Sequence, residues 1–328
     1  MIEETLWHPV ALSPAVAQAP VAVQLLETEL VLWRDGTGAV RAWADRCPHR
    51  GARLSLGQVQ DGQIECPYHG WRFEGAGRCT HVPALPDFTP PASHCAQTYT
   101  ACEAYGLVWV RLAHWGDVAP ALPAFVAEDD ARLRKVNCGP YDVKASAPRI
   151  VENFLDMAHF GFVHEGWLGA RSSAAIDNYT VQTTPTGLLA TGCKAWQPQS
   201  NPHSTGPAQV EYTYEVCAPY TAVLTKVPDA ATVPIDGYRE SIALFVCPIT
   251  PELSRVWFRL AVADFESTDE KLRAFQHTIF TQDQPVLESQ QPKRLPLDLR
   301  AELHTAADKA SSSYRRFLKE HGIAFGTC

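Results

Sequence analysis

Two short loops, each pairing a cysteine with a histidine, constrain this sequence more than any other feature. The first loop carries Cys47 and His49, and the second, sixteen residues later, carries Cys66 and His69. A proline follows each cysteine and stiffens its loop, so four soft-to-borderline ligands can converge with little cost in chain ordering. Any fold of this chain is therefore expected to bring the two loops face to face.

Two kinds of metal site accept two cysteines and two histidines. One is a structural zinc site, although zinc fingers usually pair cysteine with cysteine and histidine with histidine. Here each loop mixes the two types, which suits a binuclear cluster with two cysteines on one iron and two histidines on the other. That is the Rieske [2Fe–2S] arrangement. The spacing and the flanking Arg50-Gly51 and Gly70-Trp71 pairs favour it, and zinc stays the alternative.

A second set of ligand-type residues lies near the middle of the chain. Asn153, Asp156 and His159 recur at every third position of an expected helix, and His164 lies five residues beyond His159. On an unbroken helix that offset is roughly 140°, so the helix must end or distort before both imidazoles can meet. Gly161 permits such a distortion.

Two histidines and one carboxylate form the facial triad of non-haem iron sites. A lone histidine is more often a hydrogen-bonded core residue, but His159 and His164 form a pair downstream of a redox cluster, which favours a metal. The spacing does not select the carboxylate, and Asp283 is one of several candidates.

Composition sets wider bounds on fold and function. The chain has 328 residues, of which 46% are hydrophobic, and this predicts two domains with substantial cores. Its 36 acidic and 28 basic residues give a net charge of -8, which argues against general affinity for nucleic acid or anionic membranes. The sequence shows neither a membrane-span pattern nor a secretory signal, so we expect a soluble cytoplasmic protein.

Short strands separated by turns fill the first third, and strands mixed with helices fill the rest. We therefore expect an α+β protein with an all-β domain over residues 1–118 and a second domain over 119–328. Helices are expected over residues 149–160, from Ser267 to Asp283 with Pro285 ending or kinking it, and over 305–320. Strands are expected over residues 21–33, 39–43, 71–73, 78–80, 105–112, 179–183, 210–216, 241–247 and 255–263.

Over nearly its whole length the chain resembles the α-subunits of Rieske non-haem iron oxygenases. The two loops match Cys-x-His-x16-Cys-x2-His, and residues 153–164 match the family's mononuclear iron motif, Asn-x2-Asp-x2-His-x4-His. The short branch of monooxygenases and oxidative demethylases is most similar. Residues 282–290 resemble caffeine-type N-demethylases, and residues 164–169 and 314–328 resemble saxitoxin-tailoring Rieske oxygenases.

The resemblance implies a Rieske domain followed by a helix-grip-like catalytic domain with an antiparallel sheet, assembled as a head-to-tail homotrimer. It makes Asp283 the carboxylate ligand and gives Asn153 and Asp156 catalytic roles. Asp156 would accept hydrogen bonds from His159 of its own site and His69 of a neighbouring subunit. A carboxylate shared in this way orients both imidazoles and couples their protonation to electron arrival. The alternative for Asp156 is an ordinary capping or surface aspartate.

The implied activity is that of a monooxygenase with a [2Fe–2S] cluster and a mononuclear Fe(II). It would use O2 and NAD(P)H-derived electrons to hydroxylate or oxidatively demethylate a small aromatic or N-heterocyclic substrate. The sequence has no flavin or nicotinamide motif, so a separate reductase would deliver the electrons, directly or through a ferredoxin. Two alternatives stay open: hydroxylation without demethylation, and a Rieske electron carrier with an inactive ligand-binding domain.

Candidate substrate contacts lie on the helix that carries Asp283. Gln276 lies seven residues earlier, on nearly the same face, with Ile279 and Phe280 between them. If Asp283 faces the iron, Gln276 should face the same cavity about 10 Å away along the axis. Its amide would then orient polar atoms of the substrate, while Ile279 and Phe280 supply apolar contact. The alternative is a glutamine hydrogen-bonded to nearby backbone.

Overall fold

The chain forms two compact units, Met1–Ala121 and Leu122–Cys328. The boundary expected at residue 118 lies outside the described residues, because the computed structural model describes every residue except three segments: 114–119, 199–205 and 230–237. Across the described part of the chain, no helix has the length and apolar character needed to cross a membrane.

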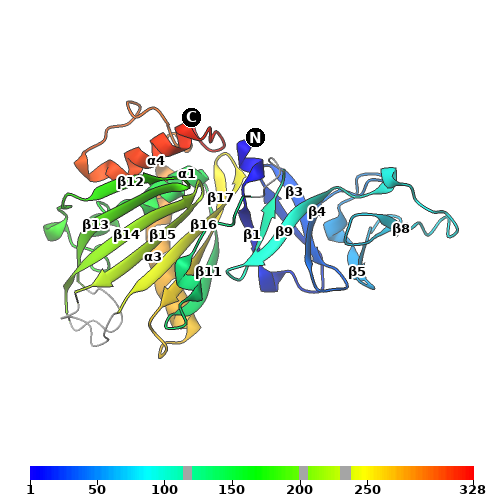
Figure 1. Ribbon diagram of the computed structural model, residues 1–328, viewed down its shortest axis with the longest axis horizontal. Coiled ribbons are helices and arrows are strands. Elements are labelled where there is room, and N and C mark those ends of the chain that lie inside the picture. The colour runs from blue at the N-terminus through cyan, green and yellow to red at the C-terminus, as the bar shows by residue number, and fades with distance from the viewer. Residues whose placement is uncertain (114–119, 199–205, 230–237) are drawn as a thin grey trace. The chain divides into compact units, whose positions relative to one another are not determined.

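The first unit consists of two antiparallel sheets (Figure 1). The larger sheet has six strands in the order β1 (His8–Leu12), β10 (Leu107–Arg111), β9 (Thr98–Ala104), β4 (Val40–Ala44), β3 (Thr28–Arg34) and β2 (Val21–Leu25). The smaller sheet has four short strands, β5 (Gln58–Gln60), β6 (Gln63–Glu65), β7 (Arg72–Phe73) and β8 (Cys79–His81). Both cysteine–histidine loops belong to this smaller sheet, because the first loop precedes β5 and the second joins β6 to β7.

The single strand expected over residues 21–33 is wrong. The segment is a hairpin, β2 and β3, that turns at Leu26 and Glu27 with φ of 49° and 62°. Left-handed backbone at two successive non-glycine residues is uncommon, and the usual turn residues are absent here. The turn therefore carries no glycine, asparagine or aspartate that would mark it in the sequence.

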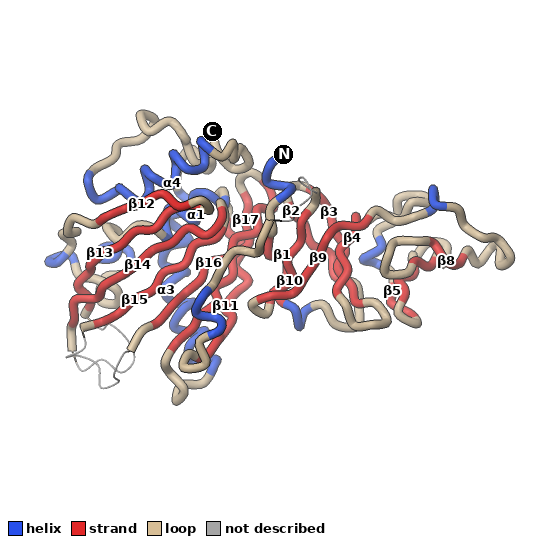
Figure 2. Tube along the Cα trace, viewed as in Figure 1, coloured by secondary structure: helices blue, strands red, loops and turns tan. Residues whose placement is uncertain are grey.

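The second unit is built on one seven-stranded antiparallel sheet, shown in red on the left of Figure 2. Its order is β11 (Arg134–Val143), β17 (Leu253–Val262), β16 (Glu240–Thr250), β15 (Thr221–Pro228), β14 (Ala208–Ala218), β13 (Gly187–Gln197) and β12 (Thr180–Thr184). Three helices lie against it: α1 (Ala147–Phe154), α3 (Asp269–Ser289) and α4 (Lys309–Glu320). The expected α+β class, with an all-β unit before a mixed one, is confirmed.

Three of these strands, β11, β13 and β15, were not among those expected. Two of them are interrupted: β11 by a bulge after Cys138 at the Gly139-Pro140 pair, and β13 by a bulge after Ala190 next to Gly192. A bulge shifts which side chains face the core, so it breaks the two-residue periodicity by which strands are recognised.

The helix expected over residues 149–160 is shorter than predicted. Ser146 caps α1, whose last residue is Phe154, so Asp156 and His159 lie beyond it rather than along one helical face. The Asp156 carboxylate accepts a hydrogen bond from the backbone N–H of Ala158 at 2.8 Å. Such a local bond competes with helical hydrogen bonding and favours a turn.

The bounds of α3 also differ from expectation. Thr268, not Ser267, caps it, with its side chain accepting a hydrogen bond from the Lys271 N–H. The helix does not end near Asp283 but continues through Pro285 to Ser289. The proline removes one backbone hydrogen bond, yet Leu287 beyond it is 1% exposed, and its burial holds the last turn against the sheet.

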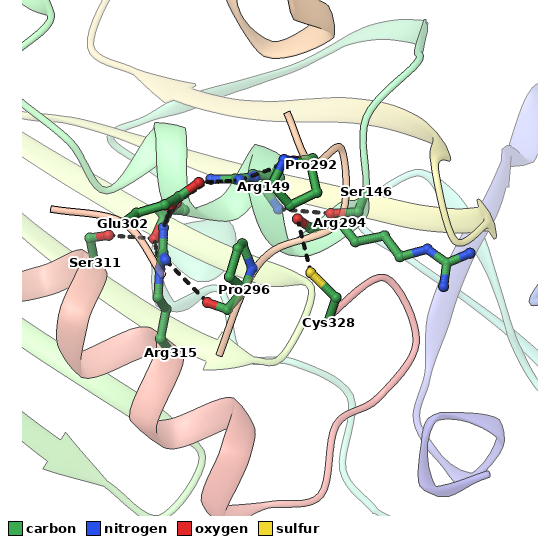
Figure 3. Close-up of polar contacts among 10 residues, drawn as sticks. Ser146, Arg149, Pro292, Arg294, Pro296, Glu302, Ser311, Arg315 and Cys328 are labelled. Atoms are coloured by element: carbon green, nitrogen blue, oxygen red, sulfur yellow. Dashed lines mark hydrogen bonds and ion pairs between the residues drawn. The ribbon is translucent and has the colours of Figure 1, made fainter. Parts of the chain in front are cut away.

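Four charged side chains, two from α1 and two from the C-terminal part of the chain, tie these segments together (Figure 3). Arg149 and Arg315 are only 3% and 2% exposed, and they share the carboxylates of Glu152 and Glu302. The closest N···O distances are 2.6 Å for Arg149–Glu302 and Arg315–Glu152, and 2.5 Å for Arg315–Glu302. The guanidiniums also donate to the carbonyls of Pro292 and Pro296. This charge cluster holds in place the helix that ends at the candidate metal site.

Candidate active site

The two cysteine–histidine loops share one backbone design. In each, the cysteine N–H donates to the carbonyl of the residue five positions later, and the glycine N–H donates back to the cysteine carbonyl, at 2.8–3.0 Å. The glycines, Gly51 and Gly70, have φ of +73° and +69°, a conformation that closes such a turn at little cost only for glycine. The loops are thus matched supports for facing ligands.

The four candidate ligands are sorted by type. The Cys47 and Cys66 thiols are buried, and burial together with the neighbouring Cys66 thiol raises the pKa of Cys47 to about 12. The His49 and His69 rings are exposed, with centroids 4.6 Å apart, and His49 stacks on Trp71 at 4.4 Å. Paired sulfur ligands inside and paired imidazoles outside fit a binuclear cluster with one iron of each kind.

In the second unit, His159, His164 and Asp283 converge. His159 and His164 flank the one-turn helix α2 (Phe160–Val163), so the short turn brings both imidazoles to one side. Gly161 serves close packing rather than an unusual φ, since a Cβ there would lie 2.9 Å from the Ala170 carbonyl.

The three candidate ligand atoms lie at near-equal separations. The two imidazole Nε2 atoms are 3.2 Å apart, and Asp283 Oδ1 lies 3.5 Å from that of His159 and 3.2 Å from that of His164. Ligands about 2.1 Å from a metal and about 90° apart would be separated by about 3.0 Å. The donor set and its spacing therefore fit a facial iron site.

Outer contacts fix the two imidazoles. His159 Nδ1 lies 3.0 Å from Asp156 Oδ2, and His164 Nδ1 lies 2.8 Å from Gln282 Oε1. Both partners accept hydrogen bonds, so each Nδ1 carries the proton and each Nε2 keeps its lone pair for a metal. Burial by itself lowers the pKa of His164, but the adjacent Asp283 carboxylate raises it overall. Asn153 Nδ2 donates to Asp283 Oδ1 at 3.4 Å.

An apolar cavity of about 90 Å³ opens onto these three ligands. Aromatic side chains such as Phe154, Tyr214 and Phe258 line it, and so do the candidate substrate residues Gln276, Ile279 and Phe280. Gln276 is 7% exposed and lies in the same cavity as Asp283, as the helical spacing predicts. A second cavity of about 250 Å³ adjoins the first and shares four lining residues with it: Lys226, Ile242, Phe275 and Gln276.

Sequence reasoning missed Gln282 and the Lys226–Glu240 pair in the cavity wall. Nothing in the spacing shows that Gln282 reaches His164. Lys226 and Glu240 did carry a signal, because each is a charge in an otherwise apolar strand, and such residues are rarely buried unless paired.

Two family models together match most of the chain. The Rieske [2Fe-2S] domain matches residues 6–100, and the vanillate O-demethylase oxygenase C-terminal domain matches residues 143–322. The chain belongs to the Rieske oxygenases. The match also favours the iron–sulfur cluster over the zinc alternative for the two loops.

Relatives that align over most of their length support this membership of the Rieske oxygenases. Methylxanthine N1-demethylase NdmA of Pseudomonas putida is 33% identical over 96% of this chain and 88% of its own, and methylxanthine N3-demethylase NdmB of the same organism is 30% identical over 97% and 89%. The solved structure of Pseudomonas putida NdmA has a TM-score of 0.83 at 31% identity, covering 97% of this chain and 90% of NdmA.

Membership confirms the expected class of activity and cofactors. A Rieske oxygenase is an oxidoreductase that carries a [2Fe–2S] cluster and a mononuclear iron and uses O2 with electrons supplied by a reductase.

Proposed function

We propose that this Rieske oxygenase oxidatively demethylates a small aromatic or N-heterocyclic molecule. The observation that carries the proposal is the His159–His164–Asp283 set at one end of an apolar cavity lined by aromatic side chains. The curated relatives named as methylxanthine demethylases support the substrate class. Hydroxylation without demethylation is the second candidate, because the same cavity would serve a ring or methyl C–H bond equally.

In this proposal the chain holds its two metal groups in separate units. Cys47, His49, Cys66 and His69 hold the cluster in a Rieske domain over residues 1–118. His159, His164 and Asp283 hold the iron in a catalytic domain over residues 119–328. The chemistry that bound iron supplies is insertion of one atom of O2 into a substrate C–H bond, with the other atom leaving as water. An N- or O-hydroxymethyl product then collapses to formaldehyde.

The protein residues position and shield this chemistry. Asp156 and Gln282 hold the imidazole protons on Nδ1, and Asn153 orients Asp283 through its side-chain amide. The apolar wall keeps water from the reacting carbon and holds the ring of the substrate by packing.

Electron delivery requires partners. A separate reductase supplies the electrons, directly or through a ferredoxin, and the chain assembles as a head-to-tail homotrimer. Two features support assembly: the His69 ring is exposed, and the Asp156 side chain is 32% exposed although it accepts from His159. Asp156 can thus accept from the exposed His69 of another subunit as well.

A formaldehyde-release screen tests the function. Purified protein with a generic reductase and NADH is expected to release formaldehyde from at least one methylated aromatic or heterocyclic compound, in proportion to O2 consumed. Asp283→Ala should lose the mononuclear iron and all formaldehyde release, while the absorption of the [2Fe–2S] cluster survives. The reason is that the substitution removes a ligand of the mononuclear iron and none of the cluster. A wild-type protein that consumes O2 with product but never forms formaldehyde would support hydroxylation instead.

A second expectation concerns Gln276. Gln276→Leu should leave both metal groups and the melting temperature unchanged but lower kcat/KM for the true substrate by about 5- to 150-fold. The reason is that a buried polar group of the substrate loses its partner, at a cost of about 1–3 kcal/mol. Steady-state kinetics with parallel O2 and product measurements would detect this loss or an uncoupling. Unchanged kinetics and coupling would mean that Gln276 binds backbone rather than substrate.

A further inference from the structure

A buried ion pair lies in the wall between the two cavities. Lys226 on β15 and Glu240 on β16 are direct cross-strand partners, and Lys226 Nζ lies 2.6 Å from Glu240 Oε2. Their side chains are only 8% and 7% exposed. The Tyr238 hydroxyl donates to the other carboxylate oxygen of Glu240. Both oxygens are thus engaged, which holds this pair in one geometry.

Both residues of the pair line a cavity in which a substrate would bind. Lys226 lines both cavities and Glu240 lines the second one, while the residues around them, such as Ile242, Leu260 and Phe275, are apolar. Among the described residues, the other charged side chains on the two cavities are Asp283, which belongs to the candidate iron set, and Lys271, which is exposed to solvent. In the described part of the wall away from Asp283, Lys226 and Glu240 therefore supply one positive and one negative buried charge.

We infer that the Lys226–Glu240 pair makes this site selective for uncharged polar aromatic substrates and against aromatic carboxylates. The inference rests on the proposed function and adds the charge of the substrate to it. A buried lysine without its glutamate would attract an anion strongly, because few water molecules screen it. Glu240 beside it opposes that attraction, so a carboxylate entering the apolar space loses its hydration with little compensation. An uncharged amide or lactam has far less hydration to lose.

Glu240→Gln tests this directly. The amide has the size of the carboxylate and keeps an oxygen for Tyr238, but it removes the negative charge beside Lys226. The matched control is Glu211→Gln, which makes the same change in net charge at an exposed position on β14. The probes are 4-methoxybenzamide and 4-methoxybenzoate, which share shape and differ in charge.

Binding is measured by calorimetry on the iron-loaded protein without O2 or reductase, so no turnover is needed. Wild type and Glu211→Gln should bind the amide about tenfold more tightly than the carboxylate. In Glu240→Gln the ratio of the two Kd values should shift toward the carboxylate by at least about tenfold, which erases or reverses the preference. If Glu240→Gln does not fold, Lys226→Gln tests the opposite charge. This variant keeps Glu240 but removes the positive charge beside it, so it should bind the cation 4-methoxybenzylamine about tenfold more tightly than wild type does.

The outcomes separate this inference from the proposed function. Equal or tighter binding of the carboxylate by wild type, no binding of the amide at millimolar concentration, or an unchanged preference in both variants would overturn the inference. Formaldehyde release with equal kcat/KM from neutral and anionic compounds would overturn it while supporting demethylation. A charge switch in binding without any formaldehyde release would support it and contradict demethylation.

Discussion

Asp156→Asn is expected to lower turnover by about 100-fold while both metal groups stay bound. The carboxylate accepts from His159 Nδ1 at 3.0 Å through one oxygen and from the Ala158 N–H at 2.8 Å through the other. An asparagine offers one acceptor oxygen and a donating NH2 group, so it cannot serve a second imidazole and keep both bonds. The link that we propose to His69 of a neighbouring subunit would then be lost.

The measurement is product formed per cluster oxidised in a single turnover, with iron content and cluster absorption determined on the same sample. Asp177→Asn is the control, since Asp177 is an exposed aspartate in the same unit. Near-normal turnover of Asp156→Asn with full iron content would show that Asp156 does not bridge subunits. Loss of the mononuclear iron would instead mean that Asp156 acts by holding His159 in place.

Arg315→Met is expected to destabilise the second unit by about 3–5 kcal/mol, because it leaves the buried Glu152 carboxylate without its strongest partner. Arg315 is 2% exposed and contacts both Glu152 and Glu302. Arg316→Met is the matched control, since the neighbouring side chain is exposed and its loss should change little. Chemical denaturation followed by tryptophan fluorescence would measure both variants, and equal midpoints would mean that the cluster contributes nothing net.

The same cluster predicts a response to acid. Burial by itself raises the pKa of Glu302, but Arg149 and Arg315 outweigh it and lower that pKa to about 2 from the 4.5 of the unfolded chain. A lowered folded-state pKa gives stability that is complete above pH 4.5 and is lost as the pH falls toward 2. In Arg315→Met this loss should begin at the same pH, because the pKa in the unfolded chain sets its onset, but it should end at a higher pH and be smaller in total. Melting temperatures from pH 6 to about pH 2 would reveal the difference, with the wild-type slope as reference.

The sequence predicted local features well and long-range ones poorly. Both cysteine–histidine loops were identified because all their ligands lie within 23 residues and their geometry depends only on tight turns. Asp283 lies 119 residues after His164, and only the family resemblance singled it out. The length of α1 was wrong because a side-chain hydrogen bond at Asp156 favours a turn over further helix.

Strand register explains most of what was missed. Lys226 and Glu240 are separated by fourteen residues, and only the pairing of β15 with β16 places them opposite one another. The bulges in β11 and β13 hide those strands from any periodic pattern. Side chains that meet across a sheet depend on register, which a single sequence does not encode in a readable spacing.

The packing of the last six residues bears on how the protein is made. Ile323 and Phe325 are buried, Tyr220 donates to the Phe325 carbonyl at 2.9 Å, and Cys328 exchanges backbone hydrogen bonds with Leu295 and Leu297. The second unit therefore cannot finish folding until these residues have left the ribosome. All four cluster ligands lie in the first 69 residues, so the first unit can fold and take up iron and sulfide earlier in synthesis. We expect the two iron groups to be acquired in sequence, with the mononuclear iron entering only after residues 323–328 have been synthesised.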